Sequence, residues 1–448
     1  MNPTRLLSVI CVAEGAEMPA LLGQSQRDWA AACGFTGQRG RLLGLPAADG
    51  SLIGYLFGVG RAEDRPTLVM GLAAAALEPG CYELRGQFGD PTLAALGFRL
   101  GAYRFDRYKK GRAAPTLDYP DGADVPEVDR LVEAAFLARD LVNTPANDLG
   151  PDAFEREIRA FAERHDMTLT AIIGDELLVH NFPMIHAVGR GGPEAPRLMD
   201  LAWGDPAAPK VTLVGKGVTF DTGGLDIKPA ASMLLMKKDM GGAANVLGLA
   251  HAIIDAKLKV RLRVLIPIVE NSISANAFRP GDILPSRSGQ TVEIGNTDAE
   301  GRLILGDALT FADEERPELL LDMATLTGAA RTALGPDLPP LYSTDDALAR
   351  DLMAAGLASD DPLWHMPLWA PYDRMMDSRI ADMNNAGSTP FAGSITAAMF
   401  LKRFVRQAKA WVHLDIFAWA PEARPGRPQG GTDQGIRAVY GVLKSRYS

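Results

Sequence analysis

The chain has 448 residues, of which 47% are apolar and 23% are charged, close to the averages of globular proteins. This composition excludes a disordered, collagen-like or disulfide-scaffold chain, and the length suffices for two or three domains of roughly 150 residues each. Acidic residues outnumber basic ones by 55 to 46, and the net charge of −9 argues against nucleic acid as the main partner.

The cysteines and the apolar segments indicate the compartment. Cys11, Cys33 and Cys81 form no Cys-x-x-Cys pair and are odd in number, which predicts free thiols rather than a disulfide framework or a thiolate metal site. No apolar run approaches the roughly 18–20 residues that span a bilayer. The first apolar segment, Leu6–Ala13, has only Arg5 before it and no small-residue cleavage site, so we expect a strand there. These observations predict a cytoplasmic protein with no membrane partner.

The first part of the chain mixes short apolar runs with turn signals. The expected elements after the first strand are a strand at Leu52–Val59 and helices at Leu93–Tyr103 and Asp129–Val142. The stretch Ala114–Pro126 is rich in Pro, Asp and Gly and is interpreted as a linker. We therefore expect a smaller N-terminal α/β domain over residues 1–125 and a second domain over residues 126–448.

The second part alternates strand-like and helix-like runs. The expected strands are Thr168–Ile173, Val211–Val214, Val260–Val269, Leu319–Met323 and Trp411–Phe417. The expected helices are Ala153–Glu163, Ala243–Ala256, Leu303–Ala312 and Ile395–Arg406. Several strands are apolar on both faces, as in a sheet covered by helices on each side. The predicted fold class is two-domain α/β, with a mostly parallel sheet flanked by helices in the C-terminal domain.

A parallel sheet places its chemistry in the loops that follow the strands, and three polar motifs occupy such places. The first is VGKGVTFDTGG, which contains Lys216 and Asp221 and is followed by Lys228. Its glycines lack the spacing of a phosphate-binding loop and instead would let the backbone pack closely around the two charged side chains. Taken singly, such charges are more often solvated surface residues.

The second and third motifs add acidic residues. MKKDMGGAA contains Asp239 just ahead of a predicted helix, where an aspartate alone is more often a helix cap than a metal ligand. NTDAEGRL contains Asp298, Glu300 and Arg302. In extended backbone, residues at i and i+2 point the same way, so the two carboxylates could converge on one cation.

Together the motifs supply four carboxylates and two lysines, while histidines are few and the His-Glu-x-x-His zinc pattern is absent. Two divalent cations roughly 3.5–4 Å apart would explain four acidic groups that would otherwise repel one another. This reasoning leaves a two-metal phosphoesterase open as well as a peptidase. A binding protein on the same scaffold is a further alternative.

The strings VGKGVTFDTGG, MKKDMGGAA and NTDAEGRL, in this order, resemble the signature segments of the leucyl aminopeptidases, the two-metal peptidase family M17 of cytosol aminopeptidases. The resemblance covers roughly residues 130–448. It implies one metal site formed by Lys216, Asp221, Asp239 and Glu300 and a more exchangeable site formed by Asp221, Asp298 and Glu300. Lys216 can be a ligand only as a neutral amine, which requires a depressed pKa.

The resemblance also implies catalytic roles. Lys228 would polarise the scissile carbonyl and stabilise the tetrahedral intermediate, and Arg302 would hold a bicarbonate that acts as general base for the metal-bridging water. The implied reaction is hydrolysis of the N-terminal peptide bond of peptides, with two Zn²⁺ or Mn²⁺ ions per subunit. The implied assembly is a homohexamer, and the variable N-terminal domain would take part in forming it.

Substrate contacts transfer by position as well. The implied substrate-binding residues are Met236, Asn296, Thr325, Leu326, Gly328 and Ala392. An uncharged pocket with a methionine floor would suit leucine-like first residues. Outside these motifs, His413 is expected to be a hydrogen-bonded structural histidine, and Trp364 and Trp369 are expected to belong to the core or to a subunit interface.

Overall fold

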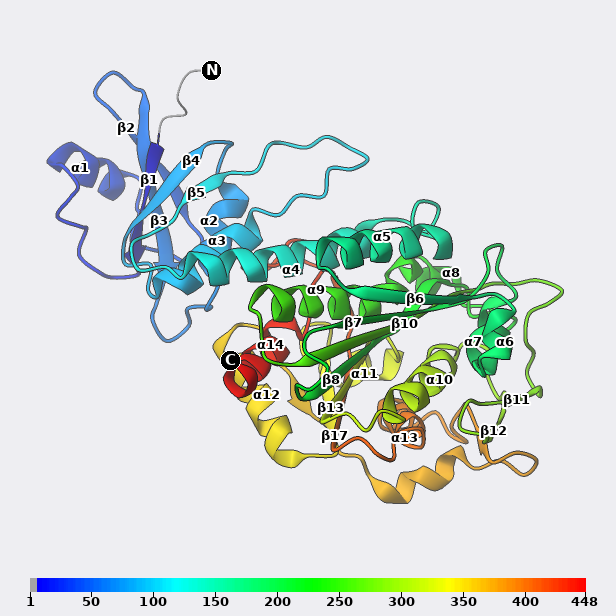
Figure 1. The fold of residues 1–448 in the computed structure, drawn as a ribbon. Helices are drawn as coiled ribbons and strands as arrows, with labels where there is room; N and C mark the ends of the chain where they lie inside the picture. Colours follow the sequence, from blue (N-terminus) through cyan, green and yellow to red (C-terminus); the bar gives the residue numbers. More distant parts are fainter. Residues whose placement is uncertain (1–5) are drawn as a thin grey trace. The chain divides into compact units, whose positions relative to one another are not determined.

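The computed structural model describes residues 6–448, which form two compact units (Figure 1). The first unit contains the chain up to residue 136 with residues 358–360 and 420–430, and the second contains residues 137–357, 361–419 and 431–448. The chain passes from the first unit to the second within α4 (Val125–Asn143). Among the helices of residues 6–448, none has both the length and the apolar character needed to cross a membrane. The domain boundary expected after residue 125 stays a prediction.

The first unit is built on a five-stranded sheet in the order β2-β3-β1-β4-β5. Its strands are β1 (Leu6–Ala13), β2 (Leu42–Pro46), β3 (Leu52–Gly60), β4 (Cys81–Gly86) and β5 (Thr116–Asp118). Its helices are α1 (Gln24–Ala32), α2 (Met70–Ala76) and α3 (Pro91–Gly101). All strand pairs are parallel except β2 with β3. The strand expected at Leu6–Ala13 is confirmed, and Val9, Phe57 and Phe98 lie in the core beside it.

The expected linker at Ala114–Pro126 is wrong in two places. Thr116–Asp118 pairs with β4 as strand β5, and α4 begins at Val125 rather than at Asp129. Asp124 explains the early start, because its side chain accepts a hydrogen bond of 3.1 Å from the backbone N–H of Glu127 and so caps the helix. Strand β5 is defined by its pairing with β4, which is distant in the sequence. The Pro- and Gly-rich residues around it therefore carry no local signal of a strand.

The second unit is built on a nine-stranded sheet in the order β15-β14-β17-β13-β8-β10-β7-β6, with β9 also paired to β10. Its strands are β6 (Thr168–Ile173), β7 (Arg197–Trp203), β8 (Lys210–Gly215), β9 (Gly217–Asp221), β10 (Arg261–Asn271), β13 (Leu319–Ala324), β14 (Pro340–Ser343), β15 (Trp364–His365) and β17 (Ala410–Asp415). The pairs among β8, β9, β10, β13 and β17 are parallel. The five expected strands of this unit are confirmed within a few residues, and the antiparallel strand β7 was not anticipated.

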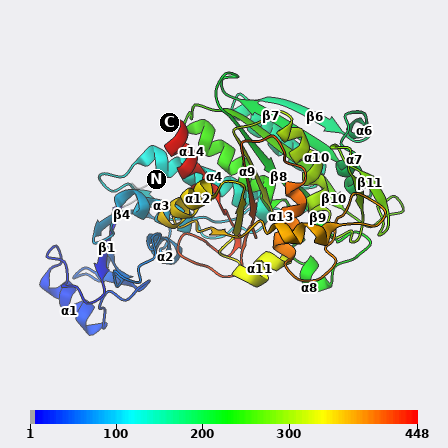
Figure 2. The same cartoon turned by 90° about the horizontal axis from the view of Figure 1, so that it is seen from below.

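Helices cover both faces of this sheet (Figures 1 and 2). One face carries α5 (Pro151–Arg164), α9 (Gly241–Asp255) and α14 (Ile436–Tyr447). The other carries α7 (Pro183–Gly189), α10 (Gly301–Asp313) and α13 (Gly393–Lys402). The strands between them are buried on both sides, for example over the whole of β13. This confirms the mixed α/β fold class with a mostly parallel sheet.

Shorter elements complete the second unit. The helices are α6 (Glu176–Val179), α8 (Ala230–Met233), α11 (Gly328–Leu334) and α12 (Asp346–Ala358), with 3₁₀ turns η1 (Met236–Met240) and η2 (Ala370–Met376). The strands β11 (Ile283–Pro285), β12 (Thr291–Glu293) and β16 (Met383–Asn384) form a small sheet, and β18 (Trp419–Ala420) pairs with β19 (Gly430–Gly431). The loops at the carboxyl ends of β8, β9, β13 and β17 meet at one edge of the large sheet, where the polar motifs lie.

Candidate metal centre and active site

Lys216 stands between β8 and β9 at the centre of this edge. The predicted glycine-rich turn is in fact a strand–strand junction, because Gly217–Asp221 continues as β9 against β10. Gly301 faces Lys216 so closely that a Cβ on the glycine would lie 2.4 Å from the lysine Cε. A side chain at this first residue of α10 would displace the end of Lys216.

The Lys216 amine is surrounded by oxygen atoms. Its Nζ lies 2.6 Å from Oδ2 of Asp239 and 2.9 Å from Oε1 of Glu300, and it donates a 3.0 Å hydrogen bond to the carbonyl of Thr325. The side chains of Lys216, Asp239 and Glu300 are no more than 3% exposed. This ammonium therefore occupies a position in which positive charge is strongly favoured.

A second lysine pairs with the other two carboxylates. Nζ of Lys228 lies 2.8 Å from Oδ2 of Asp221 and also forms an ion pair with Asp298. Asp221, the last residue of β9, is oriented through its Oδ1, which accepts hydrogen bonds from the backbone of Gly223 at 2.8 Å and from Nδ2 of Asn271 at 2.9 Å. Asn271 ends the neighbouring strand β10 and was not anticipated as a positioning residue.

Asp298 and Glu300 converge, but not for the reason that the sequence suggested. The i and i+2 residues do not lie in an extended segment, since Glu300 has φ −75° and ψ −37° and is the N-cap residue of α10. Asp298 lies in the preceding turn, where its backbone N–H donates a 2.7 Å hydrogen bond to Oδ1 of Asn296. One oxygen each of Asp221, Asp298 and Glu300 lie within 4.8 Å of one another.

Asp239 reaches the cluster from η1. It does not cap the following helix, because the N-cap residue of α9 is Met240 and no side chain caps that end. Its Oδ1 accepts a 2.8 Å hydrogen bond from the hydroxyl of Thr325, the residue that follows β13. The helix-cap alternative is thereby set aside, and Thr325 acts as an orienting partner for the carboxylate.

Oδ2 of Asp239, Oδ1 of Asp298 and Oε1 of Glu300 contact the two lysine ammonium groups, and among residues 6–448 no other donor binds them. Burial, together with the charge of Asp221, raises the pKa of Asp298 to about 6 and that of Glu300 to about 8. Four carboxylates paired with two ammonium groups have an excess of negative charge, and hard oxygen donors with such an excess are what two divalent cations require. The residues present therefore fit a two-metal centre.

The same carboxylates shift the pKa values of the two lysines. Burial by itself would lower the pKa of Lys216, but the carboxylates of Asp239, Glu300 and Asp221 outweigh burial and raise it. Burial opposes and carboxylates raise the pKa of Lys228 in the same way. Lys216 can bind a metal through a neutral amine only if its pKa is lowered instead of raised. This requires that cations neutralise the surrounding carboxylates.

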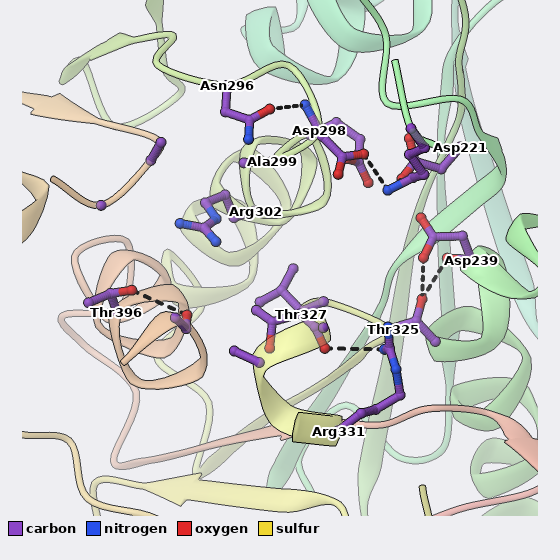
Figure 3. Close-up of a pocket in the computed structure, with 18 of the residues that line it drawn as sticks. Asp221, Asp239, Asn296, Asp298, Ala299, Arg302, Thr325, Thr327, Arg331 and Thr396 are labelled. Carbon is purple, nitrogen blue, oxygen red and sulfur yellow. Dashed lines mark hydrogen bonds and ion pairs between the residues drawn. The ribbon is translucent and has the colours of Figure 1, made fainter. Parts of the chain in front are cut away.

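Arg302 is the second residue of α10 and lies on the opposite side of the cavity from Asp221 and Asp239 (Figure 3). Its Nη1 donates a 2.7 Å hydrogen bond to the carbonyl of Asn385, whereas its buried Nε has no hydrogen-bond partner. Burial lowers the pKa of Arg302 to about 10. A buried guanidinium with an unsatisfied donor beside an open cavity fits a small anion such as bicarbonate.

The site opens into a cavity of about 360 Å³. Its lining contains the five predicted metal ligands, both predicted catalytic residues and, of the predicted substrate contacts, Met236, Asn296, Thr325, Leu326 and Gly328. Ala392 is not part of this lining, although Pro390 and Gly393 on either side of it are. The assignment of roles to these residues stays a prediction, with Ala392 the least supported of them.

The lining also contains residues that sequence reasoning missed. Lys238 and Arg331 both line the cavity, so the pocket is not uncharged as expected. The lysine pair in MKKDMGGAA was a visible signal for Lys238, since it is adjacent to a predicted ligand. Arg331 lies on α11, which had no expected boundary, and therefore had no such signal.

The expectations outside the motifs have mixed outcomes. His413 is fully buried and its Nδ1 lies 2.5 Å from Oδ1 of Asp322, which confirms a structural, hydrogen-bonded histidine. Cys11 is a buried free thiol, while Cys33 and Cys81 are free but partly exposed. Trp364 and Trp369 do not belong to the core, since both are more than half exposed.

Comparison with known proteins agrees with this geometry. Residues 136–440 match the cytosol aminopeptidase family, catalytic domain, and residues 13–117 match the M17 aminopeptidase, N-terminal domain. A probable cytosol aminopeptidase of Geotalea uraniireducens is 41% identical over 421 residues, which cover 87% of this chain and 84% of that protein. One of Rhizobium rhizogenes is 43% identical over 448 residues, covering 92% of this chain and 89% of that protein.

Solved structures show the same relationship. The cytosol aminopeptidase of Coxiella burnetii is 42% identical, with a TM-score of 0.94 over 100% of this chain and 99% of that one. The bottromycin maturation enzyme BotP in complex with Mn is 33% identical, with a TM-score of 0.90 over 99% of this chain and 100% of that one. These matches set the phosphoesterase alternative aside. The chain belongs to the cytosol aminopeptidase family, M17, and is a metal-dependent aminopeptidase that hydrolyses peptides from the N-terminus.

Proposed function

We propose that the centre binds two divalent cations, Zn²⁺ or Mn²⁺, through Lys216, Asp221, Asp239, Asp298 and Glu300. The observation that carries this proposal is the convergence of four carboxylates on one cavity, where they pair with two lysine ammonium groups and leave negative charge in excess. Asp221 and Glu300 belong to both of the proposed metal sites, and their charges act on both Lys216 and Lys228. When bound, two such cations supply Lewis-acid polarisation of the scissile carbonyl and lower the pKa of a water molecule.

The chain's own residues supply the remaining catalytic groups. The ammonium of Lys228 lies at the edge of the carboxylate cluster and lines the cavity, where it would stabilise negative charge that develops on the substrate carbonyl oxygen. Arg302 would hold a bicarbonate against its unsatisfied Nε, and this anion would accept a proton from the attacking water. Asn385 keeps the guanidinium in place through its carbonyl.

We further propose a preference for leucine-like first residues. Apart from its charged residues, the cavity is lined by small or apolar side chains that include Met236, Leu326, Ala329 and Pro390. The side chain of Met236 is flexible enough to adapt to branched aliphatic groups. Burial of such a side chain stabilises the complex by about 1.5–3 kcal/mol relative to a small one.

We also propose a homohexamer, with residues 1–125 serving in its assembly. The second unit exposes several large apolar side chains, which a subunit interface would bury. They include Trp364, Trp369, Tyr372, Ile380 and Phe391, with exposed fractions from 37% to 76%. Sedimentation velocity tests this assembly, and a monomer at micromolar concentration would contradict it.

The function is tested with leucine-p-nitroanilide and Leu-Gly as substrates. Protein loaded with Mn²⁺ or Zn²⁺ should hydrolyse both, and exhaustive chelation should abolish hydrolysis and remove bound metal, as measured by mass spectrometry. Alanine, leucine and phenylalanine p-nitroanilides compared at equal metal loading test the preference. Full activity without metal would refute the two-metal proposal, and a faster reaction with alanine would refute the preference.

A further inference from the structure

Two cations, Lys238 and Arg331, lie in the wall of the substrate cavity. The side chain of Lys238 is almost completely buried, with its residue 1% exposed, and Arg331 is partly buried on α11. The Lys238 Nζ and the Arg331 guanidinium lie 5.0 Å and 4.5 Å from the ring centre of Phe417. The two cations and the ring therefore form one compact patch, here named the cationic wall.

The cationic wall has no carboxylate partner in the part of the chain that the structure describes. Apart from its contact with Phe417, Arg331 donates one hydrogen bond, of 3.2 Å, to the carbonyl of Thr327 one helical turn earlier. Among residues 6–448, no side-chain acceptor binds the Lys238 amine. This amine is a hydrogen-bond donor in the wall of the cavity.

The nearby acid Asp415 is occupied elsewhere. Its Oδ1 accepts hydrogen bonds from the backbone of Leu326 at 2.9 Å and of Thr327 at 3.1 Å. Its Oδ2 accepts hydrogen bonds from the hydroxyl of Thr327 at 2.6 Å and of Ser394 at 3.2 Å. Four neutral donors therefore satisfy this carboxylate, and the donors of the cationic wall are left for a molecule in the cavity.

We propose that the cationic wall selects the side chain of the first substrate residue, so that N-terminal glutamate is accepted and N-terminal lysine and arginine are rejected. The proposal deepens the proposed aminopeptidase function and rests on it. The cavity is acidic at its metal-binding end and basic at the cationic wall, beside the apolar residues that suit leucine. A carboxylate at the end of an extended side chain can meet the free donors there, whereas an ammonium meets like charge.

The competing explanation is that Lys238 only balances the charge of its neighbour Asp239. In that case its removal would disturb the metal centre and slow all substrates in proportion. A ratio of rates for two substrates separates these explanations, because a general loss of activity cancels from it. Glutamate and glutamine are the suitable pair, since they have the same shape and differ in charge.

The experiment compares kcat/KM for the p-nitroanilides of glutamate (α-linked), glutamine, lysine and leucine with metal-loaded protein. The wild-type protein should prefer glutamate to glutamine by about tenfold, the usual worth of a charge-assisted hydrogen bond. Lys238→Met and Arg331→Met should each lower this ratio severalfold and raise the lysine-to-leucine ratio. Arg331→Lys, which keeps the charge, should keep most of the glutamate preference.

The matched control is Lys409→Met, which removes an exposed lysine next to β17 and should leave both ratios unchanged. Equal glutamate-to-glutamine ratios in wild-type, Lys238→Met and Arg331→Met proteins, with leucine p-nitroanilide still cleaved, would overturn this inference alone. Failure of the metal-loaded wild-type protein to cleave any of the substrates would overturn the proposed function and this inference with it. Metal content measured on each variant shows whether Lys238→Met also disturbs the centre.

Discussion

The second unit contains two groups of buried charges that are compensated in different ways. The metal-centre group consists of Lys216, Asp221, Lys228, Asp239, Asp298 and Glu300. The arginine group consists of Arg139, Asp361, Asp433 and Arg437, each no more than 2% exposed. Most members of both groups are buried, with Lys228 and Asp298 partly exposed, so burial of charge alone does not separate a catalytic site from a structural one.

In the arginine group every carboxylate oxygen has a protein partner. Oδ1 of Asp433 accepts from Nε and Nη2 of Arg139 at 2.8 and 2.7 Å, and its Oδ2 pairs with Arg437. Oδ1 of Asp361 accepts from the backbone of Gly435 and its Oδ2 from the backbone of Arg437, both at 2.9 Å. This arrangement ties α4 and α14 together with protein groups alone.

In the metal-centre group four carboxylates pair with two ammonium groups, and the pKa values of Asp298 and Glu300 are raised. In the arginine group two carboxylates pair with two guanidinium groups. The difference teaches that an excess of charge of one sign, rather than burial, marks the place where a non-protein ion belongs. Arg302 fits the same rule, since among residues 6–448 its Nε has no partner, while the Nε of Arg139 is paired with Asp433.

The largest expected effect comes from Glu300→Gln, which keeps the shape of the side chain and removes its charge. We expect kcat for leucine p-nitroanilide to fall by about a thousandfold or more, since a proposed ligand of both cations would be lost. Bound metal should fall in parallel. A kcat within tenfold of wild type at equal metal content would show that Glu300 is not a bridging ligand.

The second prediction concerns stability. Asp433→Asn leaves Arg139 and Arg437 buried without their anionic partner, which should lower the free energy of unfolding by about 3–5 kcal/mol. Asp373→Asn is the matched control, because the Asp373–Arg403 pair is partly exposed and should contribute less than about 1 kcal/mol. Urea unfolding of the metal-free proteins measures both. Equal losses in the two variants would contradict the distinction between the two groups.

The sequence predicted those parts of the fold that depend on local pattern. Mostly apolar strands such as Leu319–Met323 were correct, because helices on each side of the sheet leave them no exposed face. The short strand Thr116–Asp118 was missed because it is defined by its partner β4 and not by its own residues. The antiparallel pairing of β7 with β10 is likewise decided by residues far apart in the sequence, and no local pattern predicts it.

The candidate site was predictable where its residues lie in recognisable motifs, and less so where tertiary packing decides. The carboxylates were found by their motifs, although the reason given for Asp298 and Glu300 was wrong, since Glu300 adopts helical backbone angles. Lys238 and Arg331 could not be placed, because only the folded chain brings both to the ring of Phe417. A charged side chain next to a motif has no defined direction until its neighbours pack against it.

The third prediction tests whether Arg302 has a catalytic role, in contrast to the paired arginines of the arginine group. Arg302→Met should slow hydrolysis by about ten- to a hundredfold, less than the loss of a metal ligand, because bulk solvent can partly replace an anchored base. Added bicarbonate should accelerate the wild-type protein at lower concentration than the variant. A rate loss as large as that of Glu300→Gln, with bound metal retained, would mean that Arg302 acts on the substrate directly.

The smallest expected effect concerns a third set of buried charges, which is the pair of His413 and Asp322. Burial alone would lower the pKa of His413, but Asp322 on β13 and Asp415 on β17 outweigh burial and the charge of Arg302 on α10, so the pKa is raised. The ring of Tyr342 on β14 stacks on the imidazole at 5.9 Å and adds no charge at neutral pH. The charge of His413 is therefore compensated within the protein, although among residues 6–448 its buried Nε2 has no hydrogen-bond partner.

A histidine whose pKa rises on folding stabilises the protein fully below its unfolded pKa of about 6.5, and this contribution is lost as the pH rises through the folded value. The free energy of unfolding contributed by His413 should therefore decrease above about pH 6.5, by at most about 1.4 kcal/mol per pH unit. His413→Gln can still donate a hydrogen bond to Asp322 but does not titrate. The difference in unfolding free energy between wild-type and His413→Gln proteins, measured in urea from pH 6 to 9, should shrink as the pH rises. A difference that stays constant over this range would show that the imidazole is neutral throughout, and that this pair is held by a hydrogen bond without charge.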